Sequence, residues 1–221
     1  ARARDLAVEN DYVYLTDGVG IFTIDISDPE NPIEVAFLET PEWTYALDVS
    51  EEYVYHVSEY GFHIVNVSNP EFPTETGVNH ETDYMSDITV EGDYAYLACK
   101  SYIAIMDVSN PENPQITSTL RLPMGVHEIE LSGDVLFCSN GSDLYAVDVS
   151  DPECPEILST YQEIDMISSI HIQNNLAYVS GFQNRLEILD VSDPTNMESI
   201  VGVDTEYFIQ SIAVSENFVY A

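Results

Sequence analysis

The sequence predicts an all-β fold built from a repeated four-stranded antiparallel sheet, because three features recur at one spacing. A turn motif, Asp-x-Ser-Asp-Pro with Asn replacing Asp at some positions, starts at residues 25, 66, 107, 148 and 190. An aromatic and an aliphatic ladder keep that spacing of 41 or 42 residues: Tyr14, Tyr55, Tyr96, Phe137, Tyr178 and Tyr220, and Leu6, Leu47, Ile88, Ile129, Ile170 and Ile212. Since three independent registers agree, the chain is a repeat protein.

Each repeat is expected to contain four short strands separated by turn residues. In the second repeat the expected strands are residues 45–49, 53–57, 62–67 and 74–78. Four strands in about 41 residues is typical of all-β folds. Tight turns such as Ser50-Glu51-Glu52 and Glu91-Gly92-Asp93 join the first two strands into an antiparallel hairpin. The sequence lacks a helical period that would supply a parallel crossover, which disfavours a leucine-rich or βαβ solenoid.

Apolar residues occupy both sides of many expected strands, as in Ile103-Ala104-Ile105-Met106 and Leu186-Glu187-Ile188-Leu189. A sheet needs this pattern when neighbouring sheets cover both of its faces. Radially packed blades of a β-propeller provide such neighbours, and the period is close to the roughly 40–45 residues of known blade repeats. Five complete units and the first half of a sixth, starting at Ile212, fit the sequence. We therefore expect residues 1–221 to form a single β-propeller domain that is part of a longer ring of six or seven blades.

The third unit carries a specific family resemblance. Its segments Gly92-Asp93-Tyr94-Ala95-Tyr96-Leu97-Ala98 and Ile103-Ala104-Ile105-Met106-Asp107-Val108-Ser109-Asn110-Pro111-Glu112-Asn113-Pro114 resemble the LVIVD repeat, found in surface-exposed or secreted β-propellers of bacteria and archaea. The resemblance extends over essentially the whole chain. It implies a propeller in an extracytoplasmic setting and brings no shared catalytic motif. One departure is Met197, which weakens the fixed turn because the other units have proline there, at Pro32, Pro73, Pro114 and Pro155.

The charge of the chain excludes several classes of partner. The 221 residues include 40 acidic and 5 basic side chains, for a formal net charge of −35. Such a surface repels nucleic acid and anionic membranes. With 45% hydrophobic residues the chain can still bury a core, and it has no apolar run of about 20 residues that would span a bilayer. The partners we expect are other proteins, or copies of the chain assembling at a cell surface.

The recurring turn motif has two interpretations. Its carboxylate and hydroxyl oxygens suit a Ca²⁺ site, and they also suit an Asx turn, in which the side-chain oxygen accepts backbone N–H groups while Pro fixes φ. Asn stands at Asn66, Asn69 and Asn110 in place of the motif aspartates. Because Asn keeps the oxygen and discards the charge, the substitution favours the turn. No cofactor is expected, although calcium elsewhere on the acidic surface is left open.

Five side chains are weak candidates for a site at the central channel. The first strands of successive blades would bring together Asp48, Asp87, Glu128, Glu130 and His171. A metal or a polar ligand would sit among them. The alternative is that they only line a water-filled tunnel.

The remaining histidines and the cysteines give no metal pattern. His56, His63, His80 and His127 fall at non-equivalent repeat positions without an HxH or HExxH motif, which predicts surface or packing roles. The three cysteines, Cys99, Cys138 and Cys154, form no CxxC and are predicted to be small core or turn residues, with at least one unpaired.

Two sequons are candidates for N-glycosylation in a host that performs it, Asn66-Val67-Ser68 and Asn140-Gly141-Ser142. Asn140 is the better candidate because it lies in a turn, whereas Asn66 belongs to the repeated turn motif.

Three classes of function are compatible with these features. The leading hypothesis is a non-enzymatic extracellular or cell-surface scaffold that mediates protein–protein interaction or surface or filament assembly. It rests on short loops of nearly constant length and on the absence of a catalytic motif in the sequence. The alternative is an enzyme, or a small-ligand or metal-binding propeller, that uses the channel carboxylates and His171. A carbohydrate-binding module is a third class, and the presence of a single Trp, Trp43, argues against it.

Overall fold

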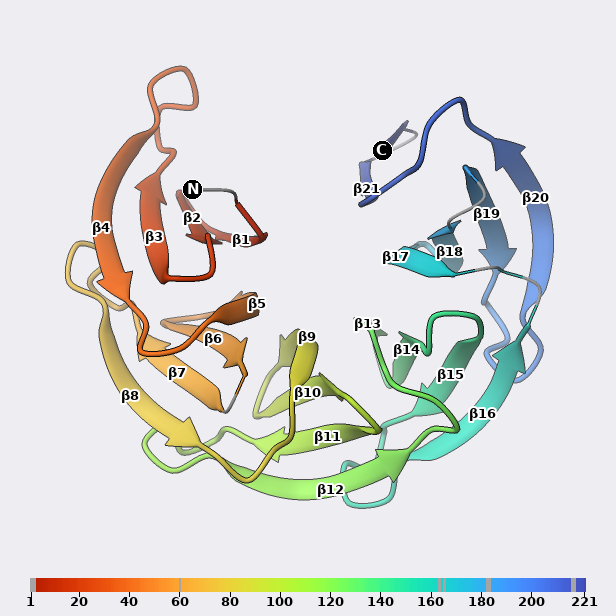
Figure 1. Ribbon diagram of the computed structural model, residues 1–221, viewed down its shortest axis with the longest axis horizontal. Coiled ribbons are helices and arrows are strands. Elements are labelled where there is room, and N and C mark those ends of the chain that lie inside the picture. The colour runs from red at the N-terminus through yellow and green to blue at the C-terminus, as the bar shows by residue number, and fades with distance from the viewer. Residues whose placement is uncertain (1–2, 60, 163, 165, 182–183, 216–217) are drawn as a thin grey trace. The chain divides into compact units, whose positions relative to one another are not determined.

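The computed structural model describes residues 3–59, 61–162, 164, 166–181, 184–215 and 218–221, and it confirms the all-β prediction. The described residues contain no helix. Within these residues, twenty strands form five antiparallel sheets of four strands each, and two further strands form a hairpin (Figure 1). In every four-stranded sheet the strands lie side by side in chain order, as an up-and-down meander. These sheets are blades of the β-propeller fold.

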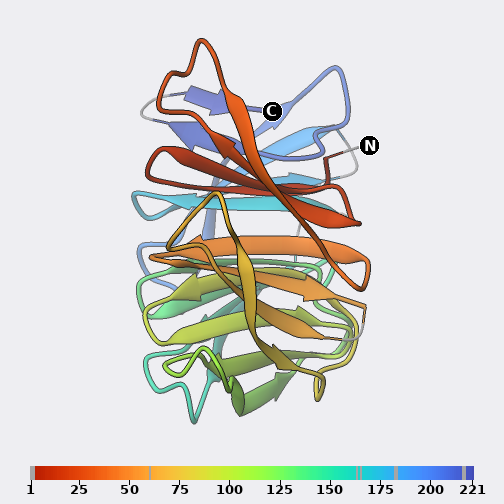
Figure 2. The same ribbon diagram turned by 90° about the vertical axis from the view of Figure 1, so that its left-hand side faces the viewer.

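The chain divides into two compact units, residues 1–119 and 120–221. The first unit holds three blades, apart from the last two residues of the third. Blade 1 comprises β1 (Asp5–Glu9), β2 (Tyr12–Thr16), β3 (Gly20–Asp25) and β4 (Ile33–Glu39), seen in red and orange in Figure 2. Blade 2 comprises β5 (Thr44–Ser50), β6 (Tyr53–Ser58), β7 (Phe62–Asn66) and β8 (Thr74–Asn79). Blade 3 comprises β9 (Met85–Glu91), β10 (Tyr94–Cys99), β11 (Tyr102–Asp107) and β12 (Gln115–Arg121).

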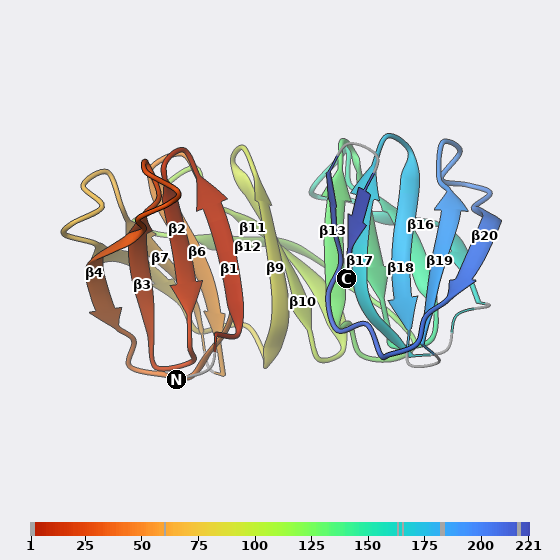
Figure 3. The same ribbon diagram turned by 90° about the horizontal axis from the view of Figure 1, so that it is seen from above.

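The second unit holds two blades and the two-stranded hairpin. Blade 4 comprises β13 (Glu128–Ser132), β14 (Val135–Ser139), β15 (Leu144–Asp148) and β16 (Glu156–Tyr161). Blade 5 comprises β17 (Ile167–Gln173), β18 (Leu176–Gly181), β19 (Arg185–Asp190) and β20 (Glu198–Asp204), which lie side by side in Figure 3. The hairpin pairs β21 (Ala213–Ser215) with β22 (Phe218–Tyr220), where the half unit is predicted.

The first hairpin of each blade turns through a residue with positive φ. The angle is 58° at Gly92 and 57° at Gly133, and it is 54° at Asn10 and 53° at Asn174. Gly and Asn adopt this left-handed conformation readily. Blade 2 has Glu51 at the equivalent position with φ of 56°, where a larger side chain makes the conformation costly. The same turn thus forms in each blade with different residues.

The repeated motif forms Asx turns, as the turn interpretation predicts. The side-chain oxygen of Asp25 accepts the backbone N–H of Ser27 at 2.8 Å, and that of Asn66 accepts the N–H of Ser68 at 3.0 Å. The later copies show the same bond at 2.9 Å. Since Asn66 makes the turn as well as the aspartates do, the turn needs an oxygen and not a charge. Met197 leaves the last turn intact, because the Asn196 amide still donates to the Asp193 carbonyl at 2.9 Å.

Apolar side chains fill the space between neighbouring blades within each unit. In the first unit, one cluster joins Tyr14 and Ile21 of blade 1 to Leu47 and Val54 of blade 2. In the second unit, Phe137 and other residues of blade 4 pack with Ile170 and its neighbours in blade 5. Both ladders seen in the sequence therefore supply core residues, which is why their spacing equals the length of a blade.

Candidate functional site

Two carboxylates of the first strands hold neighbouring blades of the first unit together. Asp5 in β1 accepts the amide of Leu6 at 2.9 Å with one oxygen and the amide of Leu47 in blade 2 at 2.8 Å with the other. Asp48 in β5 repeats this toward blade 3, accepting the amides of Val49 at 2.8 Å and Val90 at 2.7 Å. The first strand of each sheet is an edge strand, and edge amides need an acceptor. These carboxylates supply it.

Burial raises the pKa of both Asp5 and Asp48, and the backbone N–H groups that their oxygens accept oppose this rise. Each carboxylate gives up part of its hydration when it is placed between two blades, and the amides replace only some of the lost interactions. Asp48 is therefore a blade-to-blade connector in this structure, and its oxygens are already occupied by backbone donors.

The other channel candidates divide between the two units. In the first unit, Asp87 in β9 accepts the amide of Ile88 at 2.9 Å. In the second unit, Glu130 in β13 and His171 in β17 come together, with 3.7 Å between Oε1 and Nδ1. Burial lowers the pKa of His171. Glu128 lies at the start of β13 and is half-buried. Convergence of all five residues at one channel stays a prediction.

The described residues contain no group of three or more His, Cys, Asp or Glu side chains arranged to hold a metal ion. Of the cysteines, Cys99 and Cys138 are buried and Cys154 is exposed, all three as free thiols. Burial raises the pKa of Cys99 to about 12 and also raises that of Cys138, so neither is a reactive thiolate at neutral pH. These two cysteines are core residues, as the sequence predicts.

Three histidines that the sequence scatters over the repeat are brought together in blade 2. His56 in β6 and His63 in β7 are directly opposite one another, and their rings stack with centroids 4.6 Å apart and planes within 5°. The ring of His80 meets that of His63 edge-on at 6.0 Å. Both stacked rings are 2% exposed. Complete burial, with His63 as a second cause, holds the pKa of His56 well below its usual value.

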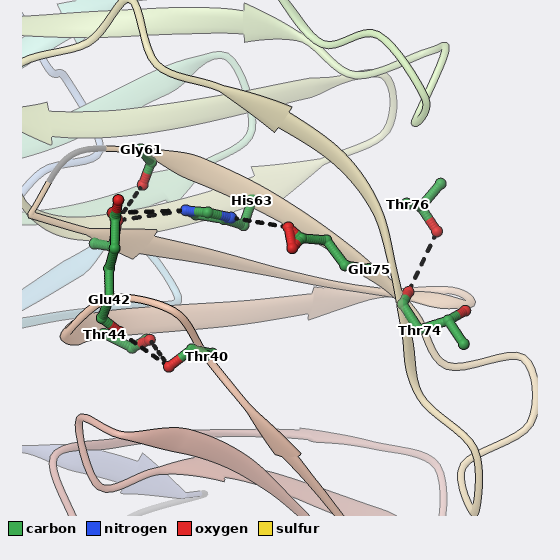
Figure 4. Close-up of polar contacts among 9 residues, drawn as sticks. Thr40, Glu42, Thr44, Gly61, His63, Thr74, Glu75 and Thr76 are labelled. Carbon is green, nitrogen blue, oxygen red and sulfur yellow. Dashed lines mark hydrogen bonds and ion pairs between the residues drawn. The ribbon is translucent and has the colours of Figure 1, made fainter.

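Polar side chains surround His63 on both sides of its ring (Figure 4). Its Nδ1 lies 3.3 Å from an oxygen of Glu75, and its Nε2 lies 3.4 Å from the hydroxyl of Ser58. This order of serine, histidine and carboxylate is the order found in hydrolases. However, Ser58 donates its proton to Glu42 at 2.6 Å and is fully buried. Ser58 therefore lacks the access that a nucleophile needs, and its proton points to Glu42 and not to His63, so the group is a buried polar network.

The two sequons differ in how the structure uses their side chains. Asn140 is 3% exposed, and its amide nitrogen donates to the Tyr145 hydroxyl at 3.1 Å and to Asp143 at 3.2 Å. A glycan replaces one of the two hydrogens on that nitrogen, so at least one of these bonds would be lost, and the burial of Asn140 leaves the glycan little room; the folded turn therefore disfavours the site. Asn66 uses its oxygen in the Asx turn. Glycosylation at either position stays a prediction.

This chain is a repeat protein with the β-propeller fold. Its four-stranded meanders each contain an Asx turn, and carboxylate-to-amide bonds join neighbouring meanders in the first unit. A family model of the LVIVD repeat matches five of its segments, residues 2–40, 44–79, 84–120, 125–163 and 166–205. The chain therefore belongs to the LVIVD repeat family, as the resemblance of its third unit predicts.

Solved structures of propellers have the same fold with little sequence similarity. A protein from Lactobacillus plantarum superposes with a TM-score of 0.81 at 16% identity, over 92% of this chain and 71% of the other. The β-propeller domain of Myceliophteria thermophila Cps50 (Swd1) gives 0.80 at 12% identity, over 96% and 75%. The computationally designed Ika8 protein gives 0.74 at 10% identity, over 99% and 67%. At these identities the similarity shows the fold alone.

No curated protein matches the chain. In the described part of the chain, no helix is long and apolar enough to cross a membrane.

Proposed function

We propose that this chain is a non-enzymatic scaffold, extracellular or at a cell surface, that binds other proteins or assembles with them. The observation that carries the proposal is the use of the first-strand carboxylates as connectors. Asp5 and Asp48 have both oxygens occupied by backbone amides of two blades. These bonds hold each carboxylate between two blades, so we assign these residues to the fold and assign contact with partners to the outer surface.

The surface supports this assignment in two ways. Large aromatic side chains are exposed in both units, among them Phe72 at 69% and Tyr207 at 75%. Aromatic residues are enriched at protein interfaces because they bury much area with few rotatable bonds. The net charge of −35 keeps copies of the chain apart and favours partners or cations of opposite charge.

The test uses the tagged full-length protein in its source organism. Protease added to intact cells should remove the tag, and chemical crosslinking of intact cells should join the protein to discrete partners. A periplasmic or cytoplasmic protein of known location serves as the control for leakage. Retention of the tag in intact cells, with complete digestion after lysis, would contradict the surface location.

A second candidate is a small-ligand or metal-binding propeller, and one observation favours it. Glu130 and His171 lie 3.7 Å apart and are partly exposed, at 33% and 28% of their side chains. Calorimetric titration of the chain with Zn²⁺ and Ca²⁺ tests this pair. Binding that disappears in both Glu130→Gln and His171→Gln would support the candidate, whereas binding unchanged by these substitutions would reject it.

A further inference from the structure

An arginine of the chain lies on two aromatic rings in the first unit, one exposed and one half-buried. The guanidinium carbon of Arg4 is 4.7 Å from the ring centroid of Trp43 and 5.7 Å from that of Tyr45. Tyr45 in turn meets the ring of Tyr84 edge-on at 4.9 Å. Trp43 is 42% exposed and Tyr84 is 41% exposed. We call Trp43, Tyr45 and Tyr84 the aromatic ledge.

The position of Trp43 is fixed by the backbone beside it. Gly18 has φ of +96°, and a Cβ at that residue would come within 2.7 Å of the Trp43 ring. The Gly18 carbonyl also accepts the amide of Thr44 at 3.0 Å, so the loop between β2 and β3 is tied to the start of β5. Only glycine satisfies both the close approach and the left-handed backbone. The ring is therefore presented rigidly, and binding to it costs little side-chain entropy.

Charged residues frame the ledge. Glu59 is exposed and close enough to contribute to the raised pKa of Tyr45, after burial and Tyr84. Asp83 precedes Tyr84 and is exposed. The backbone amide of Lys100 donates to the Tyr84 carbonyl at 2.9 Å. Of the five basic residues of the chain, Arg4 contacts the ledge through its side chain, and Lys100 is joined to Tyr84 through its backbone.

We propose that the aromatic ledge binds an arginine-bearing basic segment of a partner protein, and that Arg4 occupies part of this site in the free chain. A guanidinium over an aromatic face is attracted by the ring electrons, most strongly for Trp. The observed Arg4 geometry shows that the ledge accepts that group. The net charge of −35 draws a basic segment toward the chain from a distance. This inference rests on the proposed function as a protein-binding scaffold and names the chemistry of the partner.

The occupancy by Arg4 makes a distinctive prediction. A partner guanidinium must displace Arg4 from Trp43, so removal of Arg4 should strengthen binding. Arg4→Gln should raise the affinity about three- to tenfold, the range expected for freeing an exposed cation–π contact and removing a nearby like charge. Arg121→Gln is the matched control, because Arg121 is also exposed and the substitution changes the net charge equally. It should change the affinity much less.

The probe is a blocked peptide with several arginines spaced by Gly and Ser, compared with the same peptide carrying neutral citrulline. Trp43 is the only tryptophan in the chain, so its fluorescence reports directly on the ledge. The arginine peptide should give a saturable change and the citrulline peptide none. By calorimetry, Tyr84→Leu should weaken binding about three- to tenfold while Tyr84→Phe retains it. Tyr207→Leu, at a more exposed aromatic of the second unit, should leave it unchanged.

Three outcomes would overturn the inference. The first is an equal response to the arginine and citrulline peptides. The second is an equal gain in affinity from Arg4→Gln and Arg121→Gln, which would show general electrostatic attraction. The third is saturable binding of a neutral oligosaccharide in place of the peptide. If peptide binding fails while crosslinking at the cell surface still yields partners, only the ledge assignment falls. If the ledge binds the peptide but the tag is inaccessible on cells, the proposed function falls.

Discussion

A carboxylate oxygen of Asp48 accepts the backbone amide of Val90 at 2.7 Å, so a side chain of one blade completes the hydrogen bonding of the next. The relationship between Asp5 and Leu47 repeats it one blade earlier. In the second unit the hydroxyl of Ser169 accepts the amide of Ile212 at 3.2 Å, a neutral version of the same connection. Backbone pairing joins strands only within a sheet, so these side chains of the first strands supply hydrogen bonds between neighbouring sheets.

Removal of this connection should destabilise the fold. Asp48→Ala leaves the amides of Val49 and Val90 without their acceptor. Because hydrogen bonds to charged groups contribute about 1.5–3 kcal/mol and burial of the carboxylate offsets part of this, we expect a loss of about 1–2 kcal/mol in the free energy of unfolding. Urea unfolding measures it. Glu112→Ala removes one exposed charge and is the control. Equal stability of the two variants would contradict the connector role.

The buried aspartates should also make stability depend on pH. Because the pKa of Asp48 is raised above 3.8, the folded state binds this proton more tightly than the unfolded chain does. The additional stability that this proton confers is therefore fully present below 3.8 and is lost as the pH rises through the raised pKa. We expect the wild-type melting temperature to increase from pH 7 toward mildly acidic pH. The increase should be smaller in Asp48→Asn, and identical pH profiles would argue against this cause.

The turn aspartates have the opposite effect at lower pH. The hydroxyl and amide of Ser109 bond the Asp107 carboxylate and lower its pKa below 3.8, and Asp190 is lowered in the same way by Ser192. Their stabilisation is present above 3.8 and is lost as the pH falls through the lowered values. The melting temperature of the wild type should therefore fall below about pH 3.8. The fall should be smaller in Asp107→Asn, because Asn66 shows that an amide oxygen, which does not titrate, also forms the turn.

The unusual turn at Glu51 offers a stabilising substitution. Its φ of 56° is left-handed, and the equivalent residues are Gly92 and Gly133 in two other blades. Glu51→Gly should raise the free energy of unfolding by about 0.5–1 kcal/mol. Glycine removes the cost of the left-handed conformation, and the greater freedom that it gives the unfolded chain offsets part of this gain. Glu52→Gln removes the same charge without changing that conformation and should have a smaller effect. A loss of stability in Glu51→Gly would contradict the prediction.

Salt should stabilise the folded chain. A net charge of −35 is confined to a smaller volume in the folded state than in the unfolded chain, so self-repulsion favours unfolding. Screening shortens the range of this repulsion from about 10 Å at 0.1 M to about 3 Å at 1 M. The melting temperature should rise as NaCl is increased over that range, by more than an uncharged osmolyte produces. A flat or falling midpoint would indicate charges already neutralised by bound cations.

The aliphatic ladder gives a test of the longer ring. Leu6 is 54% exposed, whereas Leu47 and Ile129 at equivalent positions are 4% and 5% exposed. In this chain Leu47→Ala should cost about 2–5 kcal/mol and Leu6→Ala less than about 1 kcal/mol. If a further blade covers blade 1 in a longer ring, Leu6→Ala should become as costly as Leu47→Ala in a chain extended by additional LVIVD units. An unchanged small cost in the extended chain would contradict that arrangement.

The sequence determined the strands, the turns and the family of this protein, because these depend on local chemistry repeated at a constant spacing. The ladders that contain Tyr14 and Leu47 established the length of the repeat. The Asx turns followed from oxygen-bearing side chains that bond an amide two residues away, and Asn66 identified the group needed. Each of these features involves neighbours in the sequence, so one repeat predicts the next.

Only the tertiary structure decided the contacts between residues of different periodicity. The stacked His56 and His63 are opposite one another in a hairpin. The register of backbone hydrogen bonds brings them together, and no histidine motif in the sequence predicts that register. Arg4 reaches Trp43 because the loop after β2 is tied to the start of β5, about 40 residues from Arg4. Whether Asp48 serves a ligand or a neighbouring blade was likewise open in the sequence. Its oxygens meet the Val90 amide only when two sheets pack, and such packing depends on the shapes of both.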